Sequence, residues 1–214
     1  MSSTTSPSDT PGQARTYVRS KSVVVYKTKE EFGGLSNMSS GFPLQINGVR
    51  ILTTEALYQS CRFPLLPEVQ REIIGQHSPM TAKMKSKPHR KHTRPDWEEV
   101  RFKIMRWCLR VKLAQNHSEF GRLLTATRNK PIVEQSRKDD YWGAKISADD
   151  ETLVGQNVLG RLLMELRERL MDDSSGLLLT VEPLSIPDFL LLGRPVETIT
   201  GHASTVIKPQ KALF

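Results

Sequence analysis

The chain has 214 residues and a mass of 24.2 kDa, a length that predicts one domain with room for a short appendage. Hydrophobic residues make up 37% of it, which is enough to form a core at this length. The net charge of +8 and the sequence pI near 9.6 favour an acidic partner, such as nucleic acid, a phosphate or an anionic surface. With two cysteines, Cys61 and Cys108, the chain has neither a disulfide scaffold nor a four-cysteine zinc site.

The N-terminal stretch MSSTTSPSDTPGQ contains no apolar run, so we expect no signal peptide. No apolar segment approaches the ~20 residues that are needed to cross a bilayer, and the sparse cysteines fit a reducing compartment. We therefore expect a soluble, cytoplasmic protein that has no membrane partner.

The positive charge is concentrated in one stretch of the chain. Between Lys83 and Lys112 there are eleven basic and three acidic residues, a surplus that equals the net charge of the whole protein. A local surplus favours a binding face, and the plain alternative is a solvated basic loop and helix. The predicted contacts to nucleic acid are Lys85, Lys87, Arg90, Lys91 and Arg94.

The secondary-structure signals are a few short strands followed mainly by helices. Asn47-Gly48 is typical of a hairpin turn because both residues adopt positive φ angles readily. Thr54 is typical of a helix N-cap, with Glu55 in the first turn, and residues 139–150 are expected to form an aromatic, acidic loop. The expected strands cover 22–26, 44–46, 49–52 and 131–135, and the expected helices cover 55–62, 67–76, 79–86, 96–115, 119–127 and 155–171.

The long helix expected over 96–115 carries two cations on its apolar side. With about 100° between successive residues, Arg101 and Lys112 project from the middle of the apolar arc. A buried cation needs a carboxylate, a phosphate or a shifted pKa. Each of these two residues therefore pairs with a buried acid, extends to the surface, or lines a ligand pocket, and the spacing leaves these alternatives open.

Six motifs follow one another in an order that resembles a known family. They are FGGLSNM (32–38), TTEALYQSCRF (53–63), SPMTAK (78–83), RPDW (94–97) opening a helix that ends KLAQN (112–116), IVEQSRKDDYWG (132–143) and GQNVLGRLLMELR (155–167). Each motif is weak alone, but together they resemble the NADAR family of YbiA-like N-glycosidases.

The resemblance implies an α+β fold that is mainly α-helical, with one catalytic domain over 17–172 and a small β-sheet or hairpin near its N-terminus. Residues 1–16 are rich in Ser, Thr, Pro and Gly, which predicts a disordered segment. Residues 173–214 form an extension of unknown role, expected to pack on the domain as short extended pieces.

The resemblance also implies hydrolysis of an N-glycosidic bond without a metal or cofactor. The first candidate substrate is ADP-ribose on the guanine amino group, in DNA or in a free nucleoside or nucleotide, with the enzyme acting as antitoxin to a DNA ADP-ribosyltransferase. A second candidate is a ribosylamino-pyrimidine intermediate of riboflavin synthesis. A third possibility, from a different class, is a non-catalytic module that binds ADP-ribose or nucleic acid.

Three residues match catalytic positions of the family. Cleaving a ribosyl C–N bond needs a proton for the leaving nitrogen, a negative group near the cationic C1′ and an activated water. Glu55 is the implied general acid/base, unless it is only a first-turn glutamate favoured by the helix dipole. Asp139 would orient the ribose hydroxyls or the water, or only make an Asx turn. Lys83 would bind phosphates or form a Schiff base with the opened ribose, or be a surface lysine.

The remaining matched residues are implied to bind the substrate. Trp97 and Trp142 offer rings on which a base could stack, with core packing as the alternative, especially for Trp97. Gly33 permits close backbone approach, and Glu134 is a candidate ion-pair partner of Arg101 or Lys112. Asn157 and Gly160 open the last helix, whose N-terminal amides suit a phosphate. The full predicted set is Phe32, Gly33, Leu35, Ser36, Asn37, Gln59, Trp97, Arg101, Lys112, Glu134, Trp142, Gly143, Asn157 and Gly160.

Overall fold

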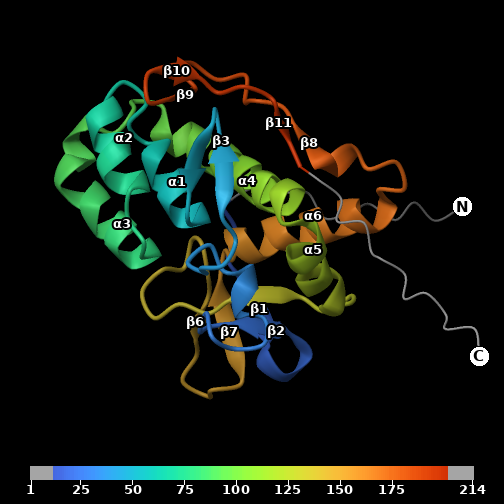
Figure 1. Ribbon diagram of the computed structural model, residues 1–214. Helices are drawn as coiled ribbons and strands as arrows, with labels where there is room; N and C mark the ends of the chain where they lie inside the picture. The colour runs from blue at the N-terminus through green and yellow to red at the C-terminus, as the bar shows by residue number, and fades with distance from the viewer. Residues whose placement is uncertain (1–11, 202–214) are drawn as a thin grey trace, which may run out of the picture.

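The structure is a computed structural model that describes residues 12–201. It has the expected α+β fold with mainly α-helical content (Figure 1). The long helix α4 is central, because α1, α5, α6 and the C-terminal segment all contact it. The α-helices of this part of the chain are α1 (Thr54–Ser60), α2 (Pro67–Ile74), α3 (Pro79–Ser86), α4 (Trp97–Gln115), α5 (His117–Ala126) and α6 (Val158–Asp172).

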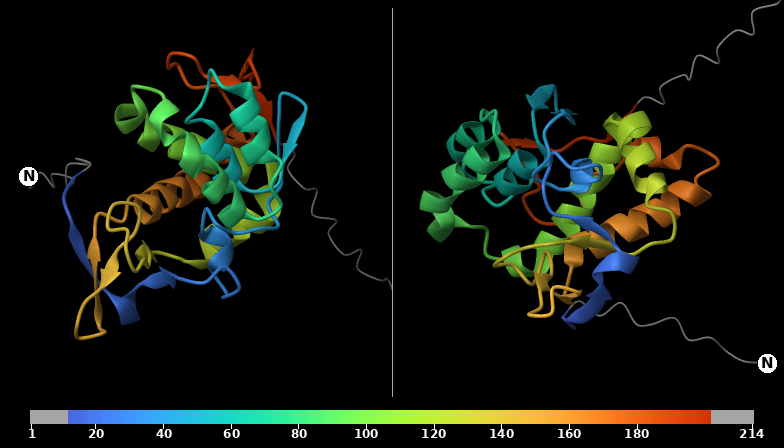
Figure 2. Two further views of the ribbon diagram at one scale, coloured as in Figure 1. Left: turned by 90° about the vertical axis from the view of Figure 1, so that its left-hand side faces the viewer. Right: turned by 90° about the horizontal axis from the view of Figure 1, so that it is seen from below.

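The strands form several small sheets rather than one. β7 is the middle strand of an antiparallel sheet with β1 and β6, while β2 and β5 form a parallel pair. Figure 2 shows that β1 and β2 lie together with β5, β6 and β7 on one side of the molecule, away from the C-terminal strands. The strands are β1 (Arg15–Val18), β2 (Val23–Val25), β3 (Leu44–Ile46), β4 (Val49–Ile51), β5 (Ile132–Glu134), β6 (Lys145–Ile146), β7 (Thr152–Gly155), β8 (Thr180–Val181), β9 (Leu190–Leu191), β10 (Arg194–Pro195) and β11 (Ile199–Thr200).

The β3–β4 hairpin forms where Asn47-Gly48 predicts it. Both turn residues have positive φ, 50° and 78°, which matches the twist of a two-residue hairpin loop. Leu44 pairs with Ile51 across the ladder, and both side chains are buried. The hairpin therefore contributes its apolar face to the main core.

Three local predictions were wrong. The N-cap of α1 is Thr53, whose side chain accepts a hydrogen bond from the Ala56 amide, so that Thr54 is already helical. Residues 15–16 were expected to be disordered but pair with β7 as part of β1. Residues 12–14 form a turn and irregular backbone, and residues 1–11 of that expectation lie outside the described residues. Strand β6 lies in the segment that we expected to be a loop, and β7 ends at Gly155, where we expected a helix to start. Strands of two and four residues carry little sequence periodicity.

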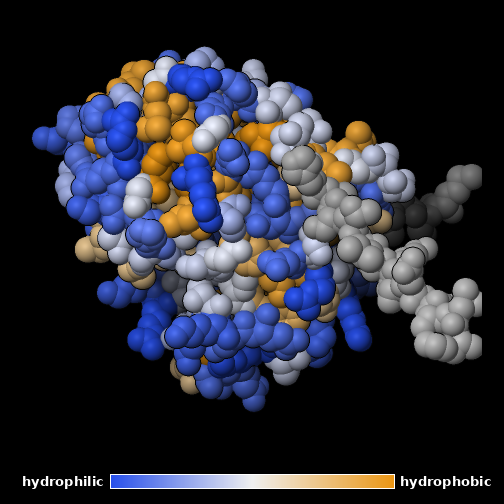
Figure 3. Space-filling model, in the orientation of Figure 1, coloured by the Kyte–Doolittle hydropathy of each residue, from blue (hydrophilic) through white to orange (hydrophobic). Residues whose placement is uncertain are grey.

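The C-terminal segment Leu177–Gly201, here called the C-terminal strap, packs on the helices as short extended pieces. Val181, Leu191 and Ile199 are buried in the main core. The Trp107 indole of α4 donates a hydrogen bond to the Glu182 carbonyl at 3.0 Å. On the face shown in Figure 3, hydrophobic residues gather in the upper half, and the part below them is mostly hydrophilic. Residues 202–214 lie outside the described part of the chain.

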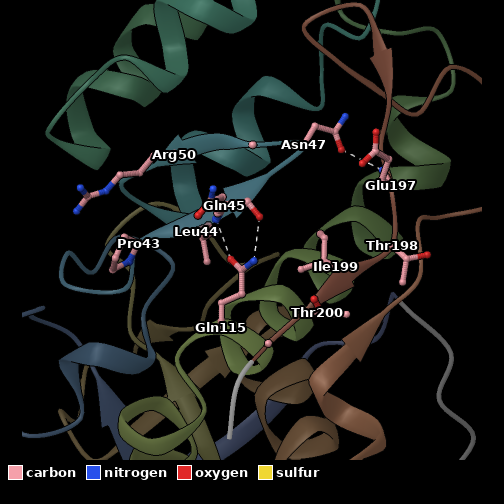
Figure 4. A pocket seen from close by; sticks show the side chains of 12 residues that line it. Pro43, Leu44, Gln45, Asn47, Arg50, Gln115, Glu197, Thr198, Ile199 and Thr200 are labelled. Carbon is pink, nitrogen blue, oxygen red and sulfur yellow. Dashed lines mark hydrogen bonds between the residues drawn. The ribbon is translucent and has the colours of Figure 1, made fainter. Parts of the chain in front are cut away.

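A cavity of about 520 Å³ marks the seam between this strap and the hairpin (Figure 4). On its wall the Gln115 side chain pairs with both the amide and the carbonyl of Gln45, at 2.8 Å each. Asn47 binds the strap through the Pro195 carbonyl and the Glu197 amide. Side-chain amides therefore join the hairpin to α4 through Gln115 and to the strap through Asn47.

Within residues 12–201, no helix is both long and apolar enough to cross a membrane. The two cysteines, Cys61 and Cys108, are buried and free.

The Gln70 side chain of α2 binds the strap, and replacing it with alanine tests how much this contact contributes to stability. Its fully buried amide donates to the Ser60 and Leu190 carbonyls and accepts from the Leu192 amide. We predict that Gln70→Ala lowers the free energy of unfolding by about 1–3 kcal/mol, because it leaves buried backbone groups without partners. Urea denaturation measures this. The control Gln76→Ala removes a single exposed hydrogen bond, and an equal loss in both variants would contradict the assigned role.

Candidate functional site

Glu55 is a buried carboxyl group held by two amide side chains. It lies in the first turn of α1 and is only 5% exposed. Its Oε2 accepts a hydrogen bond from Asn37 at 2.5 Å, and its Oε1 accepts one from Gln59, one helical turn later, at 2.9 Å. Burial raises the pKa of Glu55, while the charge of Lys83 and the two amide donors lower it. The two amides thus fix the orientation of the carboxyl, and its raised pKa favours the protonated form more than in an exposed glutamate.

The loop that supplies Asn37 is attached to α4 by a buried lysine. Lys112 is 0% exposed. Its ammonium donates to the carbonyls of Gly34 and Ser36, at 2.6 and 3.2 Å, and to the Ser39 hydroxyl at 3.0 Å. The rings of Phe42 and Phe120 lie 4.3 and 4.4 Å from its nitrogen.

These contacts correct the prediction that Lys112 lines the substrate pocket. An ammonium group has three donors, and the loop and Ser39 accept all three. Burial lowers the pKa of Lys112 to about 7, although the negative charge of Glu134 raises it. Lys112 therefore positions the loop that holds Glu55 instead of contacting a ligand.

Glu134, at the end of β5, is the second carboxyl group of the site. Its Oε1 accepts a hydrogen bond from the Ser36 hydroxyl at 3.3 Å. Burial raises its pKa to about 7, and the negative charge of Glu55 adds to this effect. The expected ion pair is not formed: among residues 12–201, neither Arg101 nor Lys112 lies within salt-bridge distance of Glu134.

Three oxygen atoms of this cluster are buried and have no hydrogen-bond donor in the described residues. They are Asn37 Oδ1, Gln59 Oε1 and Glu134 Oε2. A buried acceptor without a donor is costly and uncommon in a folded protein. The two amide oxygens accept hydrogen bonds, and so does Glu134 Oε2 when its carboxyl is ionised, so the arrangement suits a ligand that supplies several O–H or N–H donors.

Asn157 joins α6 to β5 and builds the back of the site. It has a positive φ of 49°, and its buried side chain donates to the Ile132 carbonyl and accepts from the Glu134 amide. A Cβ on Gly160 would collide with the Ile132 carbonyl, and one on Gly143 with the Glu134 carbonyl. These glycines permit close approach within the chain, which sets the position of Glu134.

The predicted phosphate site at the start of α6 is not available. The Val158 and Leu159 amides donate to the Tyr141 and Trp142 carbonyls, at 3.0 Å each. Gln156 and Asn157 likewise donate to carbonyls of residues 140 and 143. The helix N-terminus is therefore satisfied by the preceding loop, and the prediction is corrected.

Asp139 and Lys83 lie at the edge of the site. One oxygen of Asp139 accepts hydrogen bonds from the Tyr141 and Trp142 amides, at 3.0 and 2.9 Å, so this residue does make the Asx turn. Lys83 is exposed on α3, and its charge acts on Glu55. The structure thus places both near the buried carboxyls without assigning either a chemical step.

Aromatic rings surround α1 beyond Glu55. Tyr58 lies 5.2 Å from the Trp97 ring and 5.6 Å from the Trp142 ring, measured between centroids. Trp97 is buried, so core packing accounts for it and stacking on a base does not, whereas Trp142 is partly exposed. Tyr58 and Arg62 were missed as site residues, although both belong to the TTEALYQSCRF motif, in which only Glu55 and Gln59 were singled out.

Of the residues predicted to form a pocket wall over 32–37, some contact the site and others pack in the core. Ser36 and Asn37 carry the contacts described above, but Leu35 is fully buried in the core, and Phe32 packs against that core. A Cβ on Gly33 would collide with the backbone of Thr28. Gly33 therefore admits the protein's own backbone instead of a ligand.

One member of the basic stretch does not face solvent. Arg94 is 6% exposed and binds both oxygens of Asp96, at 2.6 and 2.9 Å, and the Pro187 carbonyl at 2.6 Å. The predicted nucleic-acid contact of Arg94 is therefore corrected to an anchor of the strap. The other predicted contacts, Lys85, Lys87, Arg90 and Lys91, are exposed, although Lys85 pairs with Glu72 at 2.9 Å.

The NADAR domain family model matches residues 24–171, most of the chain. The chain belongs to the NADAR family. The N-glycosidase YbiA of Escherichia coli is 38% identical over 146 residues, which cover 68% of this chain and 86% of that protein. A riboflavin biosynthesis protein of Vibrio vulnificus is 28% identical over 160 residues, 74% of this chain and 41% of that protein.

The solved NMR structure of E. coli YbiA is also similar to this NADAR protein. It aligns with a TM-score of 0.59 and 33% sequence identity, covering 72% of this chain and 88% of YbiA. The shared fold and the named N-glycosidases among its relatives support an N-glycosidase activity, that is, a hydrolase acting on N-glycosyl bonds, for the chain.

The raised pKa of Glu134 predicts a pH-dependent stability. The folded-state pKa is about 7 against an ordinary value of 4.5, so between these values the folded state holds more protons than the unfolded state. Stability from this group is present below pH 4.5 and is lost as the pH rises to 7. Relative to Glu134→Gln, we expect the wild type to lose about 2–3 kcal/mol of unfolding free energy over this range. Urea denaturation at several pH values measures the difference, and a constant difference would contradict the prediction.

Proposed function

We propose that this NADAR protein hydrolyses the N-glycosidic bond between ADP-ribose and the amino group of guanine in nucleic acid. The observation that carries the proposal is Glu55, a buried carboxyl held by Asn37 and Gln59, with a raised pKa. A carboxyl whose pKa is raised remains partly protonated closer to neutral pH. It is therefore suited to give a proton to the leaving nitrogen.

The second requirement of the reaction is negative charge near the cationic C1′ of the transition state. Glu134 lies near enough to Glu55 for its pKa to be raised by that carboxyl. Two neighbouring carboxyls in one buried site do not ionise together easily. This supports a division of roles in which the protonated Glu55 gives its proton to the leaving nitrogen, while Glu134, already ionised, stabilises the positive charge that develops on the sugar.

The substrate's sugar fits the unpaired acceptors. The 2′ and 3′ hydroxyls of a ribose are donors, and the buried oxygens of Asn37, Gln59 and Glu134 have no donors among the described residues. Hydrogen bonds from the sugar would complete this network and place C1′ beside Glu55. Asp139, whose second oxygen is not used by its turn, would orient the attacking water.

Nucleic acid is favoured as the carrier of the modified guanine because of the exposed cations. Lys87, Arg90 and Lys91 are exposed on the turn that follows α3 (Lys87–His92), and α3 packs directly against α1. Positive charge beside the site attracts a phosphate backbone. The second candidate, a ribosylamino-pyrimidine, rests on the relative named for riboflavin biosynthesis and needs no such surface.

Glu55 provides the direct test of the reaction. With DNA that carries ADP-ribose on guanine, we expect the wild type to release ADP-ribose and Glu55→Gln to be slower by about 10²–10⁴-fold, the usual contribution of a general acid. Product release is followed by chromatography. The control Glu68→Gln changes an exposed first-turn glutamate of α2 and should retain full activity.

Two outcomes would reject the proposal. The first is no release by the wild type from guanine-modified DNA, and the second is full activity of the Glu55→Gln variant. Binding of ADP-ribose by calorimetry without any turnover would instead favour a non-catalytic binding module.

Salt dependence separates the two candidate substrates. For the double variant Lys87→Gln/Lys91→Gln, we expect the slope of log(kcat/KM) against log[salt] on modified DNA to become shallower by about 1–2. Each lysine that contacts a phosphate releases about one counterion from the DNA, and the variant loses up to two such contacts. Turnover of the free ADP-ribosylated nucleoside should be unchanged. Salt-insensitive kinetics of the wild type on DNA would favour a small substrate.

A further inference from the structure

Two arginines lie at the ends of a continuous series of aromatic rings beside Glu55. The Arg62 guanidinium lies over the Trp97 ring at 4.8 Å, and the Arg101 guanidinium lies over the Tyr141 ring at 3.9 Å. Between them, Trp97 contacts Tyr58, Tyr58 contacts Trp142, and Trp142 contacts Tyr141, with ring centroids 5.0–5.6 Å apart. The rings hold both guanidinium groups without using their N–H donors.

The Nε donor of each of these two arginines is not satisfied by the described residues. The Nε atoms of Arg62 and Arg101 are buried and have no hydrogen-bond partner among the described residues. Arg101 has one partner, Glu98, at 2.9 Å, and that carboxylate is 74% exposed. In residues 12–201, no acidic side chain lies within salt-bridge distance of Arg62. Both side chains are partly exposed, so their remaining N–H groups can reach a ligand, and a buried Nε donor without a partner is costly. The two features together point to an anion that binds here.

The surrounding charges point to the same conclusion. Burial lowers the pKa of Arg62, and the positive charges of Arg90 and Arg101 lower it further, whereas Tyr58 and the negative charge of the exposed Glu98 raise it. Cations that repel one another are stabilised together when an anion binds between them. Arginine forks match phosphate oxygens in a bidentate geometry, which makes a phosphoryl group the best-fitting anion.

The position of the pair relative to Glu55 suits a sugar phosphate. Tyr58 follows Glu55 by one helical turn of α1, and Arg62 follows directly after the helix. At about 1.5 Å per residue, the backbone at Arg62 lies ~10 Å along α1 from Glu55, and long arginine side chains span part of this distance. A ribose with C1′ at Glu55 would extend its 5′ carbon toward the two guanidinium groups.

We propose that Arg62 and Arg101 bind the phosphoryl group on the 5′ carbon of the substrate's ribose. The anion site rests on the geometry of the arginines and rings, and its place on the sugar rests on the proposed function. A diphosphate, as in ADP-ribose, and a 5′-monophosphate, as in a ribosylamino nucleotide, have this chemistry in common. Arg62 then becomes a specificity residue that selects phosphorylated sugars over free ones.

Binding of three probes tests the proposal directly: ADP-ribose, ribose 5-phosphate and ribose, measured by calorimetry. We expect at least one phosphorylated probe to bind wild type at least 10-fold more tightly than ribose. Arg62→Gln and Arg101→Gln should each weaken that binding by about 10–100-fold and leave ribose binding unchanged. Because Arg106 stacks on Phe102 on the same helix but is already paired with Glu165, Arg106→Gln is the matched control and should bind like wild type.

The outcomes distinguish a diphosphate from a monophosphate, and they distinguish a failure of the anion site from a failure of the proposed function. A loss confined to ADP-ribose assigns a diphosphate, and a loss for both phosphorylated probes assigns the phosphate next to the ribose. Equal binding by Arg62→Gln, Arg101→Gln and Arg106→Gln would overturn the site, as would wild type that binds no phosphorylated probe better than ribose. If Glu55→Gln retains arginine-dependent binding while wild type hydrolyses no modified guanine, the anion site stands and the proposed function fails.

Discussion

The buried ammonium group of Lys112 is the interaction on which the arrangement of the site depends. It connects the middle of the molecule, α4, to a loop that has almost no regular structure of its own. Because the loop's carbonyls and Ser39 accept all three N–H bonds, the loop has one position relative to α4. That position brings Asn37 to Glu55 and Ser36 to Glu134, so one cation places a hydrogen-bond donor on each carboxyl.

The burial that makes these hydrogen bonds necessary also shifts the pKa values of the charged groups. Removing water raises the pKa of both carboxyls and lowers that of the lysine, with Lys112 and Glu134 each brought to about 7. The charges of Lys112 and Glu134 therefore change near neutral pH and respond to what binds beside them. A developing oxocarbenium ion would favour the ionised form of a neighbouring carboxyl, whereas a neutral sugar would not. The ionised carboxyl therefore binds the transition state more strongly than the ground state, which is the condition for catalysis.

Sequence patterns predicted the elements far better than the partners of the charged residues. The Asn47-Gly48 hairpin and the helices up to α5 depend on local conformational preference and apolar spacing, which a sequence displays. The role of Arg94 depends on the Pro187 carbonyl, far along the chain, and that of Asn157 on Ile132. Motif order placed Glu55, Asn37 and Gln59 in one predicted site, but nothing local distinguishes Lys112, which serves the fold, from Arg101, which keeps donors free.

The C-terminal strap lies outside the family match, yet it bears on the site through α4. Its contacts at Trp107 and at Gly201, where a Cβ would collide with the Ala114 carbonyl, fix one side of that helix. Lys112 and Arg101 project toward the site from other positions on the same helix. A rigid α4 keeps the buried ammonium beneath the loop and the guanidinium over Tyr141. The strap therefore supports, from outside the NADAR domain, the element that positions both the carboxyls and the proposed phosphate site.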